Sequence, residues 1–245
     1  MSVFCYYIFM KASELKKELR KYASAERKKT NEWFFKTGKG EYGEHDRFLG
    51  ITTPDMRKVA KSFNDIPLSE LKKIIQSKYN EERETALIIL TGKYKKGDKA
   101  TQKKVYDFYM QNLKHINNWN LVDVSAPNVV GEYLVEHKSE QKILDTLVKS
   151  KSLWERRVSI LATWAFIKRE DFKWTLKNAK VLLADKHDLT HKAVGWMLRE
   201  VWKKDAEVCE KFLKDNYKQL PRTTLRYAIE RMEESKRKKF LKGEF

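Results

Sequence analysis

Cysteine, proline and glycine are all scarce in this sequence of 245 residues, which has 2 Cys, 4 Pro and 9 Gly. The two cysteines, Cys5 and Cys209, are too few for a disulfide framework and show no metal-ligand spacing, which fits a reducing cytoplasm. So few glycines and prolines cannot supply the many turns of a β-sandwich or β-barrel. The composition therefore excludes a disulfide-rich secreted domain and argues against an all-β fold.

Long hydrophobic runs are also missing. No stretch approaches the roughly 20 apolar residues of a membrane span, so we expect a soluble, cytoplasmic protein that does not bind membranes. Residues 1–10 (MSVFCYYIFM) are apolar but lack a basic leader and a small-residue cleavage site. We interpret residues 1–10 as a short N-terminal extension, with Met10 as an alternative translation start. Residues 11–245 are predicted to form a single domain.

The sequence is strongly basic. Lys and Arg number 52 and Asp and Glu 34, a formal net charge of +18. Such an excess attracts polyanions because condensed counterions are released on binding, so nucleic acid is the first partner to consider. An anionic membrane surface is the rival partner, and a solvated, lysine-rich surface with no partner is the simplest alternative.

Apolar residues recur at helical spacing from Ala12 onward, which predicts an all-α fold. Thr53-Pro54 gives a start signal, because a capping hydroxyl precedes a proline in the first helical turn. The predicted helices cover residues 11–24, 26–37, 53–63, 67–77, 80–95, 99–115, 119–136 with a break near Pro127, 139–150, 152–168, 171–184, 188–203, 205–219, 221–231 and 232–242.

An internal period of about 36 residues, the scale of helical-pair repeats, connects these helices. From Ala86 it leads to Asp123, Ser159, Gly195 and Ala228, so the position is usually held by a small residue. A small residue fits where the second helix of each pair passes close to its neighbour. The sequence therefore predicts a HEAT-like helical-repeat solenoid, an α-α superhelix whose second helices line a concave, basic face.

Asp123 stands out in this register, because a carboxylate facing the inside of the stack loses hydration. The alternative is a structural ion pair with a nearby arginine. Trp119 lies one turn earlier on the same face and is predicted to be exposed. That expectation comes from the residues at its position in the other repeats, which are Glu82, Glu155, His191 and Thr224.

Further candidates come from the later repeats. Trp196 replaces an aliphatic residue, and Arg157 lies beside Arg156 just before its own small residue. Arg156 and Lys192 share the position three residues before the small residue, and we group both with Arg157 as candidate DNA-binding residues. A core tryptophan and ordinary surface bases are the alternatives. With Asp123 the set suits a cationic sugar or base on an anionic strand.

Several motifs resemble one known family. They are FLGITTPDMRKVAK, NNWNLVDVSAP, SLWERRVSIL and HKAVGWMLREV. In residue types and in separation they are similar to the AlkD-like DNA alkylation-repair glycosylases, over about Trp33 to Met232. The resemblance implies a HEAT-like fold and excision of cationic N3- and N7-alkylated purines from double-stranded DNA, on an open concave surface rather than in a pocket.

The resemblance also implies roles for individual residues. The essential Asp of the family matches Asp123, its sugar-contacting aromatics match Trp119 and Trp196, and its backbone-contacting Arg matches Arg157.

An aromatic residue near the N-terminus that approaches the lesion falls on Phe34 or Phe35. The segment 37–47 (TGKGEYGEHDR) is longer than the shortest family forms require, which leaves room for a shifted DNA contact.

The function that follows is a monofunctional base-excision glycosylase acting as a monomer without metal or nucleotide cofactor. GKGEYG in segment 37–47 matches GxGxxG in letters, but no strand precedes it. His187 and His191 are four residues apart with no evident third metal ligand. The alternatives are a non-catalytic HEAT-like nucleic-acid-binding protein and a protein-binding scaffold.

Overall fold

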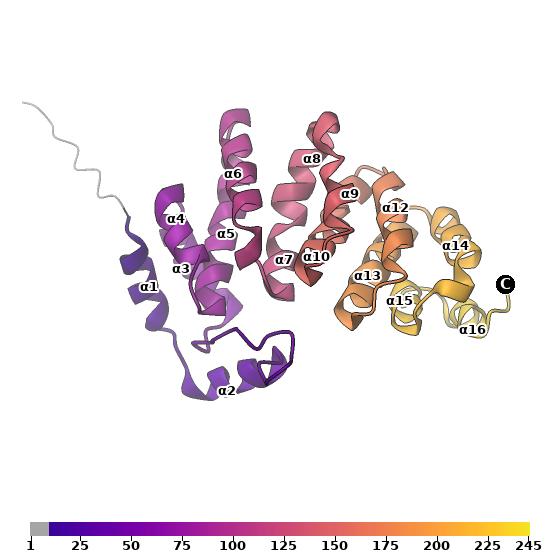
Figure 1. Cartoon of the computed structure of the whole chain (residues 1–245), viewed down its shortest axis with the longest axis horizontal. Coiled ribbons are helices and arrows are strands. Elements are labelled where there is room, and N and C mark those ends of the chain that lie inside the picture. Colours follow the sequence, from indigo (N-terminus) through magenta and orange to yellow (C-terminus); the bar gives the residue numbers. More distant parts are fainter. Residues whose placement is uncertain (1–9) are drawn as a thin grey trace, which may run out of the picture. The chain divides into compact units, whose positions relative to one another are not determined.

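The computed structural model describes residues 10–245, which fold as helices joined by short connections (Figure 1). No strand occurs within this range, and one isolated bridge pairs Arg47 with Tyr79. The all-α prediction is therefore confirmed. Of the predicted extension, residues 1–9, with Cys5, lie outside the described residues.

The chain divides into two compact units, Met1–Ser125 and Ala126–Phe245. Each unit is described separately below. The single domain over residues 11–245, the solenoid and its basic concave face stay predictions.

The first unit is organised around one long helix, α5, which packs against α3, α4, α6 and α7 (Figure 1). The first half of α5 is buried on every side, from Asn80 to Leu87. The helices of this unit are α1 (Ala12–Arg20), α2 (Ala25–Phe34), α3 (Thr53–Ser62), α4 (Leu68–Ile75), α5 (Asn80–Lys96), α6 (Lys99–Gln111), the 3₁₀ turn η1 (Leu113–His115) and α7 (Trp119–Ser125).

The start of α3 shows how the local sequence sets a helix end. The hydroxyl of Thr52 accepts a hydrogen bond from the backbone N–H of Asp55, and Pro54 lies in the first turn. Thr52 thus satisfies one of the N–H groups that have no partner at a helix start. The predicted position of this helix is confirmed, but the capping hydroxyl belongs to Thr52 and not to Thr53.

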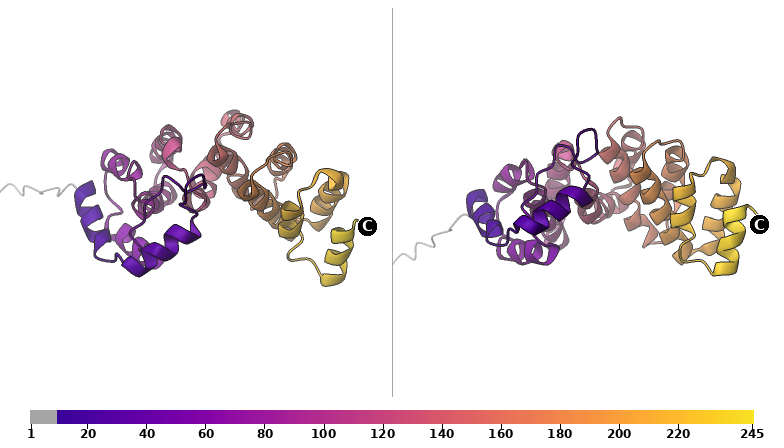
Figure 2. Two further views of the ribbon diagram at one scale, coloured as in Figure 1. Left: turned by 60° about the horizontal axis from the view of Figure 1, so that its bottom comes forward. Right: turned by 90° about the horizontal axis from the view of Figure 1, so that it is seen from below.

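In the second unit, α13 has the central place and packs against α10, α11, α12, α14 and α15 (Figures 1 and 2). The predicted break near Pro127 is a π-helical turn, η2. The helices are η2 (Pro127–Gly131), α8 (Glu132–Glu136), η3 (Lys138–Glu140), α9 (Ile143–Leu147), α10 (Leu153–Leu161), α11 (Trp164–Ile167), α12 (Lys173–Leu182), α13 (Asp188–Lys204), α14 (Ala206–Asp215), η4 (Tyr217–Gln219), α15 (Arg222–Ala228) and α16 (Glu234–Lys242).

The small residues of the predicted register are buried where helices meet. Ala86 is 2% exposed, and Ser159 and Ala228 are fully buried. A Cβ atom added to Gly195 of α13 would lie 2.6 Å from the carbonyl oxygen of Thr224 on α15. This contact between α13 and α15 confirms the physical reason for a small residue at Gly195.

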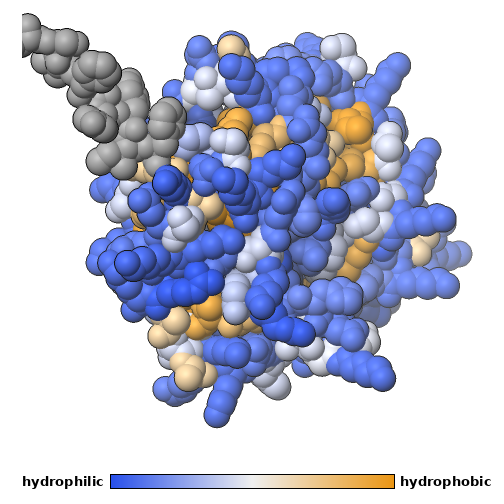
Figure 3. Space-filling model, turned by 60° about the vertical axis from the view of Figure 1, so that its left-hand side comes forward, coloured by the Kyte–Doolittle hydropathy of each residue, from blue (hydrophilic) through white to orange (hydrophobic). Residues whose placement is uncertain are grey.

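The face of the molecule in Figure 3 is largely hydrophilic, with smaller apolar patches between charged and polar side chains. Among residues 10–245, no helix combines the length and the apolar character that crossing a membrane requires.

Candidate active site

A pocket of about 620 Å³ lies within the first unit. Helices α2, α3, α5 and α7 and the connection from α2 to α3 supply its walls. Its lining residues are Arg27, Asn31, Phe34, Phe35, Phe48, Ile51, Thr52, Thr53, Pro54, Met56, Arg57, Asn80, Glu81, Glu84, Trp119, Asn120, Asp123 and Val124.

Aromatic rings form one wall of the pocket. Phe35 lies nearly parallel to Trp119, with ring centroids 4.9 Å apart and 11° between the planes. Phe34 meets the edge of Trp119 at 5.7 Å and is 53% exposed. Phe35 also stacks on Phe48, with ring centroids 4.8 Å apart. The structure thus brings Phe34 and Phe35 into contact with Trp119, which lies about 85 residues later in the sequence.

Trp119 is half-buried in this stack. The reasoning that made its repeat position an exposed one is wrong, because Glu82 is fully buried and Thr224 is 1% exposed at the equivalent positions. The Glu82 carboxylate is instead paired with the ammonium of Lys16 at 3.3 Å and the guanidinium of Arg20 at 2.8 Å. The charge of Glu82 therefore reflects an ion pair with α1 and not exposure to solvent.

Asp123 lies one helical turn after Trp119 on α7 and lines the same pocket, where it is half-buried. The helical spacing puts the carboxylate and the indole on one face. The other charged residues lining the pocket are Arg27, Arg57, Glu81 and Glu84. A carboxylate in this setting can stabilise positive charge that develops in the pocket.

Glu84 of α5 is a second acid in the pocket that the sequence analysis missed. It is 8% exposed, and the side-chain amide of Asn120 donates a hydrogen bond to its Oε2 at 2.6 Å. Burial raises the pKa of Glu84 above the usual range; the Asn120 hydrogen bond opposes this shift, the nearby Glu81 carboxylate adds to it, and Arg57 opposes it. In NEERETALIIL a glutamate is typical of the surface charges at a helix start, so its burial could not be predicted from the sequence.

Glu81, also on α5, holds the connection between α2 and α3 in place. Its carboxylate accepts hydrogen bonds from the backbone N–H groups of Leu49, Gly50 and Ile51, the shortest at 2.8 Å. Gly50 has a φ of 79°, and a Cβ there would lie 2.1 Å from the carbonyl oxygen of Ser24. Only glycine fits this turn, which carries Phe48 to the aromatic wall.

Asp46 is the centre of a buried polar network that reaches α7. Its carboxylate forms an ion pair with Arg83 and accepts hydrogen bonds from Asn80 at 2.8 Å and from Asn118 at 2.6 Å. The side-chain oxygen of Asn118 in turn accepts the backbone N–H of Trp119 at 2.7 Å. The network therefore fixes the start of the helix that carries Trp119 and Asp123.

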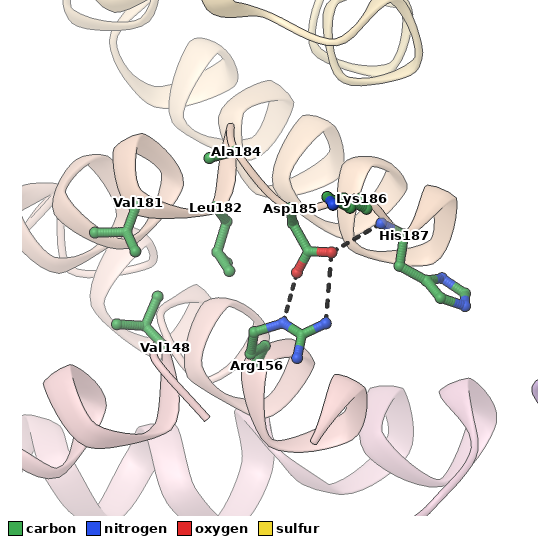
Figure 4. A pocket seen from close by; sticks show the side chains of 8 residues that line it. All are labelled: Val148, Arg156, Val181, Leu182, Ala184, Asp185, Lys186 and His187. Carbon is green, nitrogen blue, oxygen red and sulfur yellow. Dashed lines mark hydrogen bonds and ion pairs between the residues drawn. The ribbon is translucent and has the colours of Figure 1, made fainter. Parts of the chain in front are cut away.

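Two arginines of α10 in the second unit have protein partners. Arg156 forms an ion pair with Asp185 (Figure 4). Its Nε atom lies 2.6 Å from Asp185 Oδ2, and its Nη1 donates to the carbonyls of Ser150 and Lys151. These contacts hold the Arg156 guanidinium in place within the second unit. Arg157 is 5% exposed, and its Nη1 donates to the carbonyl of Leu189 at 2.6 Å.

Trp196 and Lys192 lie on α13. Trp196 is half-buried, with its ring 5.4 Å from that of Trp164 at 60° and its Nε1 3.2 Å from Oε1 of Glu200. Trp164, on α11, is an aromatic neighbour that the sequence analysis missed, because it lies outside the repeat register. Lys192 is paired with Asp188 at 2.7 Å.

His187 and His191 have structural partners. Nδ1 of His187 accepts the backbone N–H of Leu189 at 3.2 Å and caps α13, and Nε2 of His191 lies 2.6 Å from the carbonyl oxygen of Asp185. Burial lowers the pKa of His187. In the described part of the chain, no group of three or more His, Cys, Asp or Glu residues is placed to hold a metal ion.

The sequence model of one family, described as DNA alkylation repair enzyme, matches residues 15–232. The chain belongs to this DNA alkylation repair family. Its fold is similar to a solved structure from Enterococcus faecalis described as a predicted DNA alkylation repair enzyme, with a TM-score of 0.67 and 17% identity over 86% of this chain and 97% of that one. A search of curated proteins gave no significant match.

Membership of the DNA alkylation repair family supports a role in repairing alkylated DNA, with DNA as the substrate. The predicted site residues fall into two groups. Those in the pocket of the first unit are Phe34, Phe35, Trp119 and Asp123. Those in the second unit are Arg156, Arg157, Lys192 and Trp196.

Proposed function

We propose that this chain is a monofunctional DNA glycosylase that excises cationic N3- and N7-alkylated purines from duplex DNA. One observation carries the proposal. The carboxylate of Asp123 and the indole of Trp119, one helical turn apart, line a single pocket whose wall is completed by Phe35. The family match supports alkylated DNA as the substrate. The net charge of +18 also favours binding to a polyanion such as DNA.

The chemistry follows from charge. Alkylation at N3 or N7 makes the purine cationic, so the base leaves neutral and needs no proton. As the bond from C1′ to the base breaks, its electron pair goes to the base and the deoxyribose becomes oxocarbenium-like. A carboxylate about 4 Å away at an effective dielectric near 20 offers roughly 4 kcal/mol. That corresponds to on the order of a thousandfold in rate.

Trp119 and Asp123 have different roles in this mechanism. The face of the Trp119 indole favours the positive charge on the sugar. The Asp123 carboxylate stabilises that charge, orients the water that adds to C1′ and accepts its proton.

The second unit supplies DNA contacts in this proposal. On the family likeness, Trp196 is a second sugar-facing aromatic residue, Arg157 contacts the phosphate backbone and Lys192 adds positive charge. The enzyme acts as a monomer in the cytoplasm, without a metal or a nucleotide cofactor.

The test is release of 7-methylguanine from methylated duplex DNA. We expect Asp123→Asn to lower single-turnover release on the order of a thousandfold, because the amide cannot balance the developing charge. Asp107→Asn is a matched control, since Asp107 is an exposed carboxylate on α6 paired with Lys103 and lies outside the pocket.

Equal release by wild type and Asp123→Asn contradicts the proposal. No release by wild type, with duplex DNA still bound, supports the non-catalytic nucleic-acid-binding protein in its place.

A further inference from the structure

Glu84 and Asp123 reach the same pocket from two helices that pack together, α5 and α7. Asn120 connects them, because it lies one turn before Asp123 on α7 and donates a hydrogen bond to Glu84. The cationic substrates of the proposed function require one carboxylate. The buried carboxyl of Glu84 has no task in that reaction.

Asn120 holds the Glu84 carboxyl by a hydrogen bond. Asn120 Nδ2 donates to Oε2 of Glu84 at 2.6 Å and to Oδ1 of Asn80 at 2.7 Å. A protonated carboxyl has an O–H donor and keeps the capacity to accept hydrogen bonds. The acid form of Glu84 can therefore keep the Asn120 hydrogen bond, which fixes the orientation of the group.

The surroundings of Glu84 favour its protonated form. Glu84 is 8% exposed, whereas Asp123 is half-buried. The charged groups that line the pocket around Glu84 are Arg27 from α2, Arg57 from α3, Glu81 from α5 and Asp123 from α7. Burial, the largest cause, and the Glu81 carboxylate both raise the pKa of Glu84, against Asn120 and Arg57. A buried carboxyl whose pKa is raised can serve as a general acid.

The pocket is also large enough to hold a base. Its volume of about 620 Å³ falls within the roughly 300–1,000 Å³ of small-molecule sites. The exposed ring of Phe34 and the indole of Trp119 offer faces and edges for a purine removed from the duplex stack. The family resemblance implied an open surface, so a pocket that holds the base would distinguish this chain.

We propose that Glu84 is a general acid that protonates the leaving base, so that the same pocket also excises uncharged modified purines. The inference rests on the proposed function, because it uses the Asp123 site. The O–H of Glu84 transfers its proton to a ring nitrogen of the purine. The bond from C1′ to N9 then breaks with its electron pair going to the base. Water adds to C1′ and gives its proton to Asp123, and solvent returns a proton to Glu84.

The experiment compares two substrates in one assay: duplex oligonucleotides with a single 7-methylguanine, which is cationic, or a single hypoxanthine, which is neutral. Glu84→Gln keeps the size of the side chain and an oxygen that can accept the Asn120 hydrogen bond. We expect the ratio of hypoxanthine release to 7-methylguanine release to fall about a hundredfold in this variant, the lower range of general acid catalysis.

The pH profile of the wild type is a second measurement that does not depend on the variant. Hypoxanthine release should fall as the pH rises through the pKa of Glu84, because only the protonated form donates. Release of 7-methylguanine should show no such fall.

The outcomes separate the two proposals. A wild type that releases 7-methylguanine but no hypoxanthine overturns the role of Glu84 and leaves the glycosylase intact. An unchanged ratio in Glu84→Gln, or equal pH profiles for both substrates, also overturns it. A wild type that releases neither base refutes the glycosylase itself, and the role of Glu84 with it.

Discussion

The ring of Phe35 lies nearly parallel to the indole of Trp119, with centroids 4.9 Å apart. Phe35 directly follows α2, whereas Trp119 begins α7, so the contact joins two segments far apart in the sequence. Because Phe35 also stacks on Phe48, the three rings form one continuous aromatic wall. The orientation of Trp119 is therefore set by the connection between α2 and α3 as well as by its own helix.

We predict that Phe35→Leu lowers release of 7-methylguanine about threefold to tenfold. Leucine keeps apolar bulk but loses the ring stacking, which contributes about 0.5–1.5 kcal/mol beyond burial. Phe63→Leu is the control, because Phe63 is a half-buried phenylalanine at the end of α3 that does not line the pocket. The measurement is single-turnover release of 7-methylguanine. Equal activity in the two variants would show that the stack does not orient Trp119.

The adjacent residues Arg156 and Arg157 are expected to differ in their effect on DNA binding. Arg156→Met should lower stability by about 1.5–3 kcal/mol, because charged hydrogen bonds to Asp185 and two carbonyls are lost. Its DNA affinity should keep the salt dependence of the wild type. Arg157→Met should also lower stability, because the hydrogen bond to the Leu189 carbonyl is lost. In addition it should reduce the slope of log affinity against log salt by about 1, the effect of one lost phosphate contact.

Denaturant unfolding and binding titrations over a range of salt concentrations measure both quantities. A reduced slope for Arg156→Met would restore its predicted DNA contact, and an unchanged slope for Arg157→Met would remove that of Arg157.

Gly195→Ala should destabilise the protein by about 1–3 kcal/mol. The added methyl group meets the Thr224 carbonyl at 2.6 Å and the Cβ of Tyr227 at 2.5 Å, and neither can move without shifting α15. Gly92→Ala in α5 is the matched control, because the only nearby atom is the side-chain Oδ1 of Asn64 at 3.3 Å. In the Gly92→Ala variant the better helix propensity of alanine should stabilise the folded protein by up to about 1 kcal/mol. Thermal or urea unfolding that ranks the variants in the opposite order contradicts the close packing of α13 on α15.

The His187→Asn variant should lose less stability than the wild type when the pH is lowered from neutral to mildly acidic. The folded state lowers the pKa of His187, so as the pH falls below about 6.5 the unfolded chain takes up the proton first. The stability from neutral His187 is present above that pH and is lost as the pH falls through the folded-state pKa. Asparagine keeps a capping acceptor for α13 but does not titrate.

Urea unfolding at pH 7 and pH 5 measures the effect as a difference between the two proteins. His115 also has a lowered pKa, but it titrates alike in both and cancels. An identical pH dependence in wild type and variant would show that the cap is not sensitive to the protonation of His187.

The positions of several helices could be predicted from the sequence, and so could the need for small residues where two helices pack closely. Helical periodicity is a strong local signal, and α3, α5 and α13 begin at or within one residue of the predicted positions. Gly195 could be identified because a close helix contact admits no side chain. Asp123 could be identified because a carboxylate differs in kind from the small residues of its register.

Burial of charged residues could not be read from the sequence in the same way. Glu82 and Glu84 look like the solvated start of a helix, yet both are buried because α5 is surrounded by four other helices. Their partners, Arg20 and Asn120, come from distant segments. The choice between a phosphate contact and a structural role for Arg156 likewise depended on Asp185, 29 residues away.

The three backbone N–H groups that Glu81 binds lie about 30 residues before it in the chain. Amide hydrogen exchange at Leu49, Gly50 and Ile51 should therefore report whether α5 is intact, rather than any local turn. The carboxylate of Glu81 thus holds the connection that carries Phe35 and Phe48 on its path. During folding the aromatic wall should thus form after α5, and it should be the first part of the pocket to open when the native state fluctuates.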